Sequence, residues 1–119
     1  MSDESRGLRP RTKDFALRII RMYCALPKST EAQVLGKQIL RSGTSVGAHY
    51  REATRARSDA EFISKLEGGL QELEETGYWL ELLGESGVID PEKLSGLYKE
   101  NNELTAMFTA SVKTVKNRK

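Results

Sequence analysis

The chain has 119 residues and a formal net charge of +2, a length that suffices for one hydrophobic core and leaves no room for a second. Cys24 is the only cysteine, which excludes an intramolecular disulfide and favours a reducing compartment. No stretch approaches the roughly 20 consecutive apolar residues of a membrane-spanning helix and the N-terminal sequence is polar, so we expect a cytoplasmic protein without a membrane partner.

Pro10 is the first break in the sequence, and it separates an expected flexible N-terminal arm over residues 1–11 from a single domain over residues 12–117. The first predicted helix, near residues 12–26, carries a short apolar stripe. This stripe consists of Phe15, Ile19, Met22, Tyr23 and Leu26. Cys24 lies at the apolar end of the same helix, and we interpret it as a small core residue.

The second predicted helix, near residues 31–57, opens with Thr30 and Gln33 arranged as a capping box. Apolar and small residues then recur at alternating spacings of four and three, which is the pattern of a heptad seam. The seam consists of Leu35, Ile39, Ser42, Val46, His49, Ala53 and Ala56. Three glycines lie on one flank of this seam, where close approach of a neighbouring helix would offset their cost of about 1 kcal/mol each. They are Gly36, Gly43 and Gly47.

The third predicted helix, near residues 59–84, opens with Ser58 and Glu61 as a second capping box and has Gly84 as its C-cap. Its seam consists of Phe62, Leu66, Gly69, Leu73, Thr76, Leu80 and Leu83. Near its end the helix is apolar almost all round, which is typical of helices covered on every side. The surplus apolar residues there would be exposed in a lone subunit, so we interpret them as an oligomer interface. They are Tyr78, Trp79 and Leu82.

The fourth predicted helix, near residues 91–116, follows Asp90 as its N-cap and has Pro91 in its first turn. Its seam consists of Leu94, Leu97, Asn101, Leu104, Phe108, Ser111 and Val115. Stripes of matching period, joined by short loops, favour near-antiparallel packing around one core. The sequence therefore predicts an all-α fold, an antiparallel up-and-down left-handed four-helix bundle.

Charge is divided unequally between the two halves of the chain. Residues 1–57 contain twelve Lys or Arg and five Asp or Glu, a net of +7, whereas residues 58–119 contain seven and twelve, a net of −5. Four cations share an outer stripe of the second helix, about 80° wide and opposite the seam. They are Lys37, Arg41, Arg51 and Arg55. Three interpretations stay open: solvated outer faces with complementary charge between helices of the bundle, basic-to-acidic contacts between subunits, and a surface for nucleic-acid phosphates.

No catalytic or metal-binding constellation is evident. His49 is the only histidine and no Glu-x-x-His pair occurs, so we expect no metal, no cofactor and no enzymatic activity. His49 lies in a seam near Ser42 and Ser45, and we interpret it as a hydrogen-bonded core or interface residue rather than a catalytic base. A catalytic or small-molecule role would require a pocket around His49 and Glu52.

Four runs of sequence together resemble a bacterial family of four-helix-bundle proteins. They are QILRSGTSVGAHYREA (38–53), RSDAEFISKL (57–66), LEET (73–76) and YWLELL (78–83). The resemblance spans roughly residues 13–115. The family includes proteins encoded in intervening sequences of bacterial 23S rRNA genes, and it is similar to the accessory variability proteins that assist retroelement reverse transcriptases. The resemblance implies a homopentamer, and it places an asparagine, in many members, where this chain has His49.

These observations lead to one expected function and one alternative. We expect a non-enzymatic homo-oligomer, pentameric by resemblance, that acts as a nucleic-acid-associated accessory or scaffold protein. The expected partners are further copies of the chain, RNA or DNA, or a nucleic-acid-processing protein such as a reverse transcriptase. The outer stripe of Lys37, Arg41, Arg51 and Arg55 would contact phosphates. The alternative is a protein-interaction scaffold without nucleic-acid contact.

Overall fold

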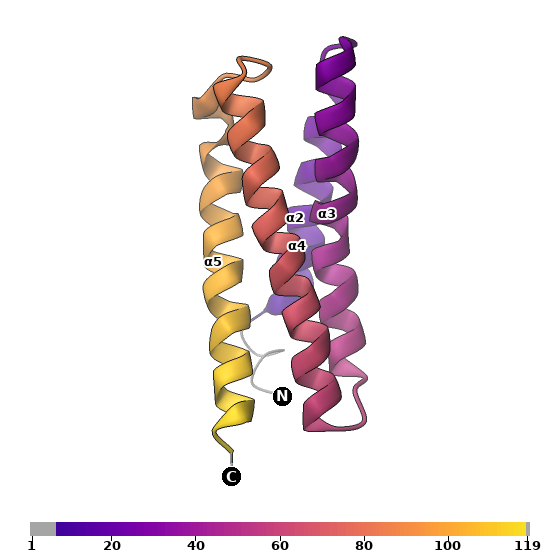
Figure 1. Ribbon diagram of the computed structural model, residues 1–119, viewed down its shortest axis with the longest axis vertical. Coiled ribbons are helices and arrows are strands. Elements are labelled where there is room, and N and C mark those ends of the chain that lie inside the picture. Colours follow the sequence, from indigo (N-terminus) through magenta and orange to yellow (C-terminus); the bar gives the residue numbers. More distant parts are fainter. Residues whose placement is uncertain (1–6, 119) are drawn as a thin grey trace.

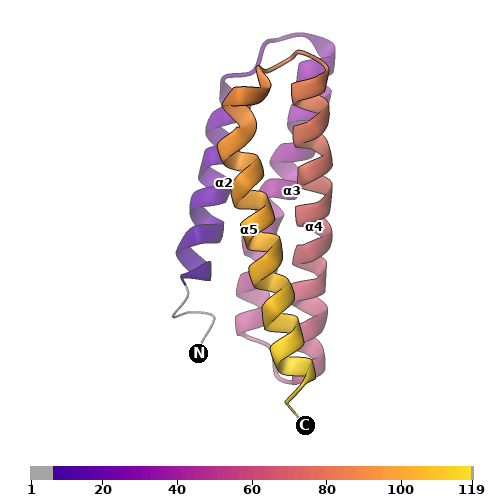
Figure 2. The same cartoon turned by 90° about the vertical axis from the view of Figure 1, so that its left-hand side faces the viewer.

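The computed structural model describes residues 7–118 and consists of four helices joined by short loops (Figure 1). The helices are α2 (Leu8–Cys24), α3 (Thr30–Thr54), α4 (Asp59–Glu85) and α5 (Pro91–Lys116). Each helix packs against the next in sequence, and neighbours run in opposite directions (Figures 1 and 2). The predicted all-α up-and-down bundle is confirmed. None of the described helices is long and apolar enough to cross a membrane.

Helix α2 begins earlier than the sequence predicts. Its N-cap is Gly7, in the left-handed region with φ 77°, and the Arg11 amide donates to the Gly7 carbonyl over 2.9 Å. Pro10 therefore lies within the first turn, where a missing N–H costs no helical hydrogen bond. The predicted arm over residues 1–11 is wrong for residues 8–11, which are helical, and residues 1–6 of that arm lie outside the described residues.

The first turn of α3 is capped by Ser29 and not, as predicted, by Thr30. The Ser29 side chain accepts a hydrogen bond from the Ala32 amide, and the Gln33 side-chain amide donates to the Pro27 carbonyl over 2.8 Å. Either hydroxyl residue can cap a helix, so the sequence alone did not separate them. The helix ends at Thr54, three residues before the predicted end.

Two of the other predicted helix ends are confirmed and one is wrong. Ser58 and Asp90 cap α4 and α5, accepting from the amides of Glu61 and Glu92 over 3.0 Å each. Gly84, the predicted C-cap of α4, is instead helical. The chain turns at Gly87, whose φ of 82° favours glycine.

The core is built from the predicted seams. Every seam position of α5 is buried except the half-buried Val115, and the same holds for α4 with the half-buried Phe62. Cys24 is exposed, so its assignment to the core is wrong. The reason is its place on the outer side of α2, away from the buried Phe15 and Ile19.

Glycines of α3 allow α2 to pack closely against it. The sequence predicts such a close approach on the flank of the seam that carries Gly36, Gly43 and Gly47. A Cβ at Gly43 would lie 2.9 Å from Ile19 Cγ1, and one at Gly47 would lie 3.2 Å from Thr12 Oγ1. Ordinary carbon contacts need about 3.5–4.0 Å. The two helices therefore pack more closely than a larger residue in α3 would allow.

Candidate functional site

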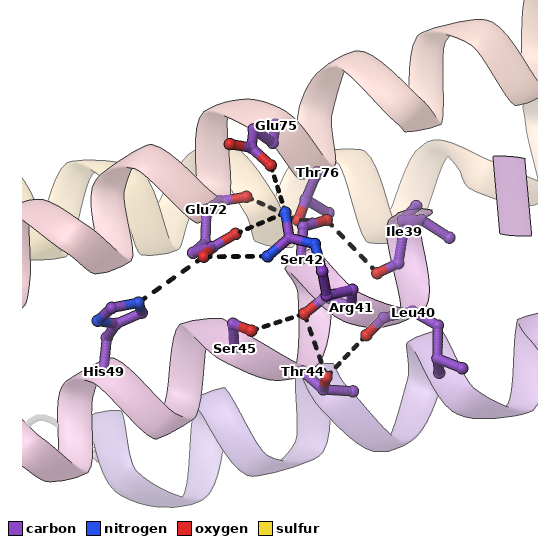
Figure 3. A network of polar contacts seen from close by, with 10 residues as sticks. All are labelled: Ile39, Leu40, Arg41, Ser42, Thr44, Ser45, His49, Glu72, Glu75 and Thr76. Atoms are coloured by element: carbon purple, nitrogen blue, oxygen red, sulfur yellow. Dashed lines mark hydrogen bonds and ion pairs between the residues drawn. The ribbon is translucent and has the colours of Figure 1, made fainter. Parts of the chain in front are cut away.

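A polar cluster joins the middle of α3 to α4, and Arg41 is its centre (Figure 3). Arg41 Nη2 lies 2.6 Å from Glu75 Oε1 and 3.3 Å from Glu72 Oε1. The hydrogen bond to Glu72 is the largest cause that raises the pKa of Arg41 above its usual value, with the charges of both acids adding to it. The Arg41 side chain is 52% exposed, so its ion pairs remain open to water and to competing anions.

Two buried hydroxyls lie beneath this ion-pair cluster. Ser42 Oγ and Thr76 Oγ1 are 2.8 Å apart, and the Thr76 hydroxyl also donates to the Glu72 carbonyl over 2.8 Å. Both side chains are fully buried, and their mutual contact is shorter than the 3.5 Å from Ser42 Oγ to the Ile39 carbonyl within α3, so it is the main polar link between the two helices at this level. This pair fixes the register between α3 and α4.

His49 adopts a different environment from the one expected. Its side chain is 30% exposed, Nε2 lies 3.7 Å from Glu72 Oε2, and Nδ1 is buried without a hydrogen-bond partner in the described part of the chain. The ring rests on Gly68, where a Cβ would come within 2.8 Å of it. Ser42 pairs with Thr76 and Ser45 donates to the Arg41 carbonyl, so the two hydroxyls that the sequence places near His49 have other partners.

The four predicted phosphate-binding cations are all exposed, but the structure separates Arg41 from the rest. Arg41 turns toward Glu72 and Glu75 of α4, whereas the other three form no ion pair with any residue between 7 and 118. They are Lys37, Arg51 and Arg55. Sequence reasoning missed Glu72 as a partner, since its contact with Arg41 joins residues 31 positions apart and depends on the register of two helices.

The three predicted interface residues differ in exposure. Tyr78 is 54% exposed, which agrees with a surplus apolar side chain on the outside of a subunit. Trp79 and Leu82 are half-buried, and Trp79 packs against the core. The Trp79 ring lies beside that of Tyr78, with centroids 5.1 Å apart, and its buried Nε1 has no hydrogen-bond partner among the described residues.

Metal ligands do not converge anywhere in the described chain. Within residues 7–118 there is no group of three or more His, Cys, Asp or Glu side chains placed to hold a metal ion. Ser45, one turn before His49, donates its hydroxyl to the carbonyl of Arg41 over 2.7 Å.

Comparison with known proteins points to one family. Residues 9–110 match the family described as 23S rRNA-intervening sequence protein. Among solved structures, the chain is similar to a protein of unknown function from the S23 ribosomal protein family of Bacteroides thetaiotaomicron VPI-5482. The two are 39% identical with a TM-score of 0.87, over 95% of this chain and 99% of that chain. No curated protein matches.

Proposed function

Because the chain belongs to the 23S rRNA-intervening sequence protein family, we propose that it is a non-enzymatic, self-assembling protein that binds nucleic acid through the outer face of α3. The observation that carries the proposal is the set of unpaired cations on that face. Lys37, Arg51 and Arg55 are exposed and form no ion pair with described residues. Their charges are thus available to phosphates at no cost in internal ion pairs.

The arrangement of the cations along α3 suits contact with the sugar-phosphate backbone of a nucleic acid rather than with its base edges. Lys37 and Arg55 are 18 residues apart on or at the end of one helix, which corresponds to about 27 Å. A convex row of cations of this length can follow a phosphate chain but cannot enter a base-reading groove from several sides. We therefore expect weak binding without sequence preference, strengthened when an oligomer repeats the stripe.

Salt dependence tests this function. Each phosphate neutralised contributes a slope of about −0.9 in log K against log salt for duplex DNA, and about −0.7 for single strands. Arg51→Glu/Arg55→Glu should abolish retention of RNA and DNA at low salt and leave the oligomer mass unchanged. Arg41 is left out of the variant because its reversal would also break the contacts with Glu72 and Glu75.

A matched control has the same change in charge on another face. Lys93 and Lys113 of α5 are exposed and have no ion-pair partner among the described residues, so Lys93→Glu/Lys113→Glu alters net charge equally. This control should retain nucleic acid. Equal loss of binding in both variants would show that only net charge matters, and no retention by the wild type at low salt would refute the nucleic-acid function.

The alternative, a scaffold that binds only proteins, is favoured by a different observation. Arg41 forms an ion pair with Glu75 of the same subunit, and the aromatic side chain of Tyr78 is 54% exposed. Aromatic residues are enriched at protein interfaces. Tyr78→Glu should then reduce the oligomer mass measured by light scattering without unfolding the subunit, and an unchanged mass would exclude Tyr78 from the subunit contact.

A further inference from the structure

A groove runs along α4 and α5 and is lined by residues of these two helices alone. It consists of two hollows of about 950 Å³ and 570 Å³, which share Glu81, Tyr98 and Asn102. Leu80, Leu94 and Gly84 line the end near the α4–α5 loop, while Leu70, Leu73 and Tyr78 line the other. Apolar side chains therefore contribute to the lining at both ends, beside polar ones such as Ser95, Asn102 and Thr105.

The rim of the groove carries more acidic than basic side chains: Lys99 is its one cation among the described residues, and of its carboxylates Glu103 is paired with Arg11. Glu74 and Glu85 stand at opposite ends, are exposed, and have no ion-pair partner among residues 7–118. Glu81 lies between them and accepts a hydrogen bond from the Tyr98 hydroxyl over 2.8 Å. An apolar floor with carboxylates at both ends suits an apolar helix face flanked by cations.

Asn101 contributes a buried polar side chain to the lining of the smaller hollow. Its residue is only 4% exposed, and its side-chain amide donates to the Leu73 carbonyl over 3.0 Å. Its Oδ1, however, is buried without a hydrogen-bond partner in the described chain, and Asn101 lines the smaller hollow.

The complementary surface lies on α2 of the same molecule. Leu17 and Ile20 are each 38% exposed, and Cys24 is exposed beside them. Lys13 and Arg21 flank these side chains, are exposed, and form no ion pair with described residues. At about 100° per residue, these five fall on one outward stripe of α2, which we call the α2 stripe.

The two surfaces also agree in length. The α2 stripe extends from Lys13 to Cys24, and the acidic rim extends from Glu74 to Glu85 on α4. Each interval is eleven residues of helix, or about 17 Å, while the two cations within the stripe, Lys13 and Arg21, are eight residues or about 12 Å apart. Asp14 is the single acidic residue of α2, and it lies about 100° from Lys13 around the helix, at the edge of the stripe.

We propose that the α4–α5 groove of one copy receives the α2 stripe of a second copy. Leu17 and Ile20 would cover the apolar floor, and Lys13 and Arg21 would pair with the unpaired carboxylates. Each copy presents both surfaces, so the contact is heterologous and propagates until a ring closes. This inference rests on the self-assembly in the proposed function and specifies its interface, while it is independent of the nucleic-acid stripe on α3.

The test measures oligomer mass by light scattering at fixed concentration. Ile20→Glu and Glu74→Lys/Glu85→Lys should each lower the mass from several times 13.3 kDa toward the mass of one chain. All three altered residues are exposed in the subunit, so circular dichroism should show native helix content. Val34→Glu is the matched control, because Val34 is 55% exposed on α3 and belongs to neither surface.

A charge exchange distinguishes a direct contact from a general effect of charge. Lys13→Glu/Arg21→Glu should dissociate the oligomer, and its combination with Glu74→Lys/Glu85→Lys should restore the wild-type mass. Wild-type mass in Ile20→Glu and in the groove variant would overturn this interface but leave assembly and nucleic-acid binding intact. A monomeric wild type would overturn it together with assembly, whereas loss of nucleic-acid retention in a full-mass oligomer would leave the interface standing.

Discussion

Gly69→Ala should lower the stability of the protein, because Gly69 packs against Phe108. Replacing a glycine inside a helix with alanine usually has the opposite effect. Gly69 lies inside α4, where alanine would ordinarily be more stable by about 1 kcal/mol. A Cβ there, however, would lie 2.6 Å from Phe108 Cε2 and 3.5 Å from His49 Cβ. Phe108 is fully buried and its ring centroid is 6.0 Å from that of Tyr50, which is also fully buried. The ring therefore has little space into which to move.

The expected cost of Gly69→Ala follows from these distances. Overpacking of a core costs about 1–3 kcal/mol, and a contact this short against a confined ring belongs in the upper half of that range. Subtracting the helical gain of about 1 kcal/mol leaves a net destabilisation of about 1–2 kcal/mol. With an unfolding entropy of about 2.1 cal/mol/K per residue and 119 residues, Tm should fall by about 4–8 °C.

The assay is thermal and urea denaturation followed by far-ultraviolet circular dichroism, at one protein concentration because assembly shifts apparent stability. Gly84→Ala is the matched control on the same helix: its Cβ would lie 3.6 Å from Leu94 Cδ1, so it should stabilise by up to about 1 kcal/mol. In a Phe108→Leu background, Gly69→Ala should lose most of its cost, a coupling of at least about 1 kcal/mol. If Gly69→Ala is as stable as Gly84→Ala, the packing argument fails.

Three further predictions concern polar groups. Thr76→Val should destabilise by about 1–3 kcal/mol because Ser42 loses its buried partner, and adding Ser42→Ala should cost little more; additive losses in urea denaturation would count against the pair. His49→Asn and His49→Leu should both stay within about 1 kcal/mol of wild type, since no hydrogen bond to described residues is lost; a larger loss for leucine alone would reveal a missing partner. The hydrogen bond to Glu81, with burial adding to it, raises the pKa of Tyr98 above its usual value, so this group stabilises the fold below its unfolded pKa near 10 and stops doing so as the pH rises through the folded pKa. The stability difference between wild type and Tyr98→Phe should therefore shrink at high pH, and a constant difference would contradict it.

Local signals in the sequence predicted the bundle well, because they depend on neighbouring residues only. The caps Ser58 and Asp90 act within their own first turns, and the heptad seams place the core without reference to other helices. Errors arose where two residues offered the same local chemistry. Ser29 rather than Thr30 caps α3, and Gly87 rather than Gly84 supplies the left-handed turn.

The candidate site was less predictable because its contacts join distant parts of the chain. The charge of Arg41 is evident from sequence, but its neutralisation by Glu75 spans 34 residues and depends on the register that Ser42 and Thr76 set. The α4–α5 groove has no sequence signal of its own, since its floor residues follow the same seam period as the rest of the core. In the sequence, the carboxylates of its rim are evident only as part of the net negative charge of residues 58–119.

Because α2 has few contacts with α5, we expect α2 to unfold locally before α3 and α4. Helix α2 packs extensively on α3 but only slightly on α5, where Arg11 joins Glu100 and Glu103 over 2.6 Å and 2.8 Å. A helix that packs mainly against one neighbour unfolds locally at a lower free energy than helices packed against two. The backbone amides of α2 should therefore exchange with deuterium before those in the middle of α4. A neighbouring subunit seated on α2 would slow that exchange, so the rate of labelling at one end of the chain would report whether its copies are associated.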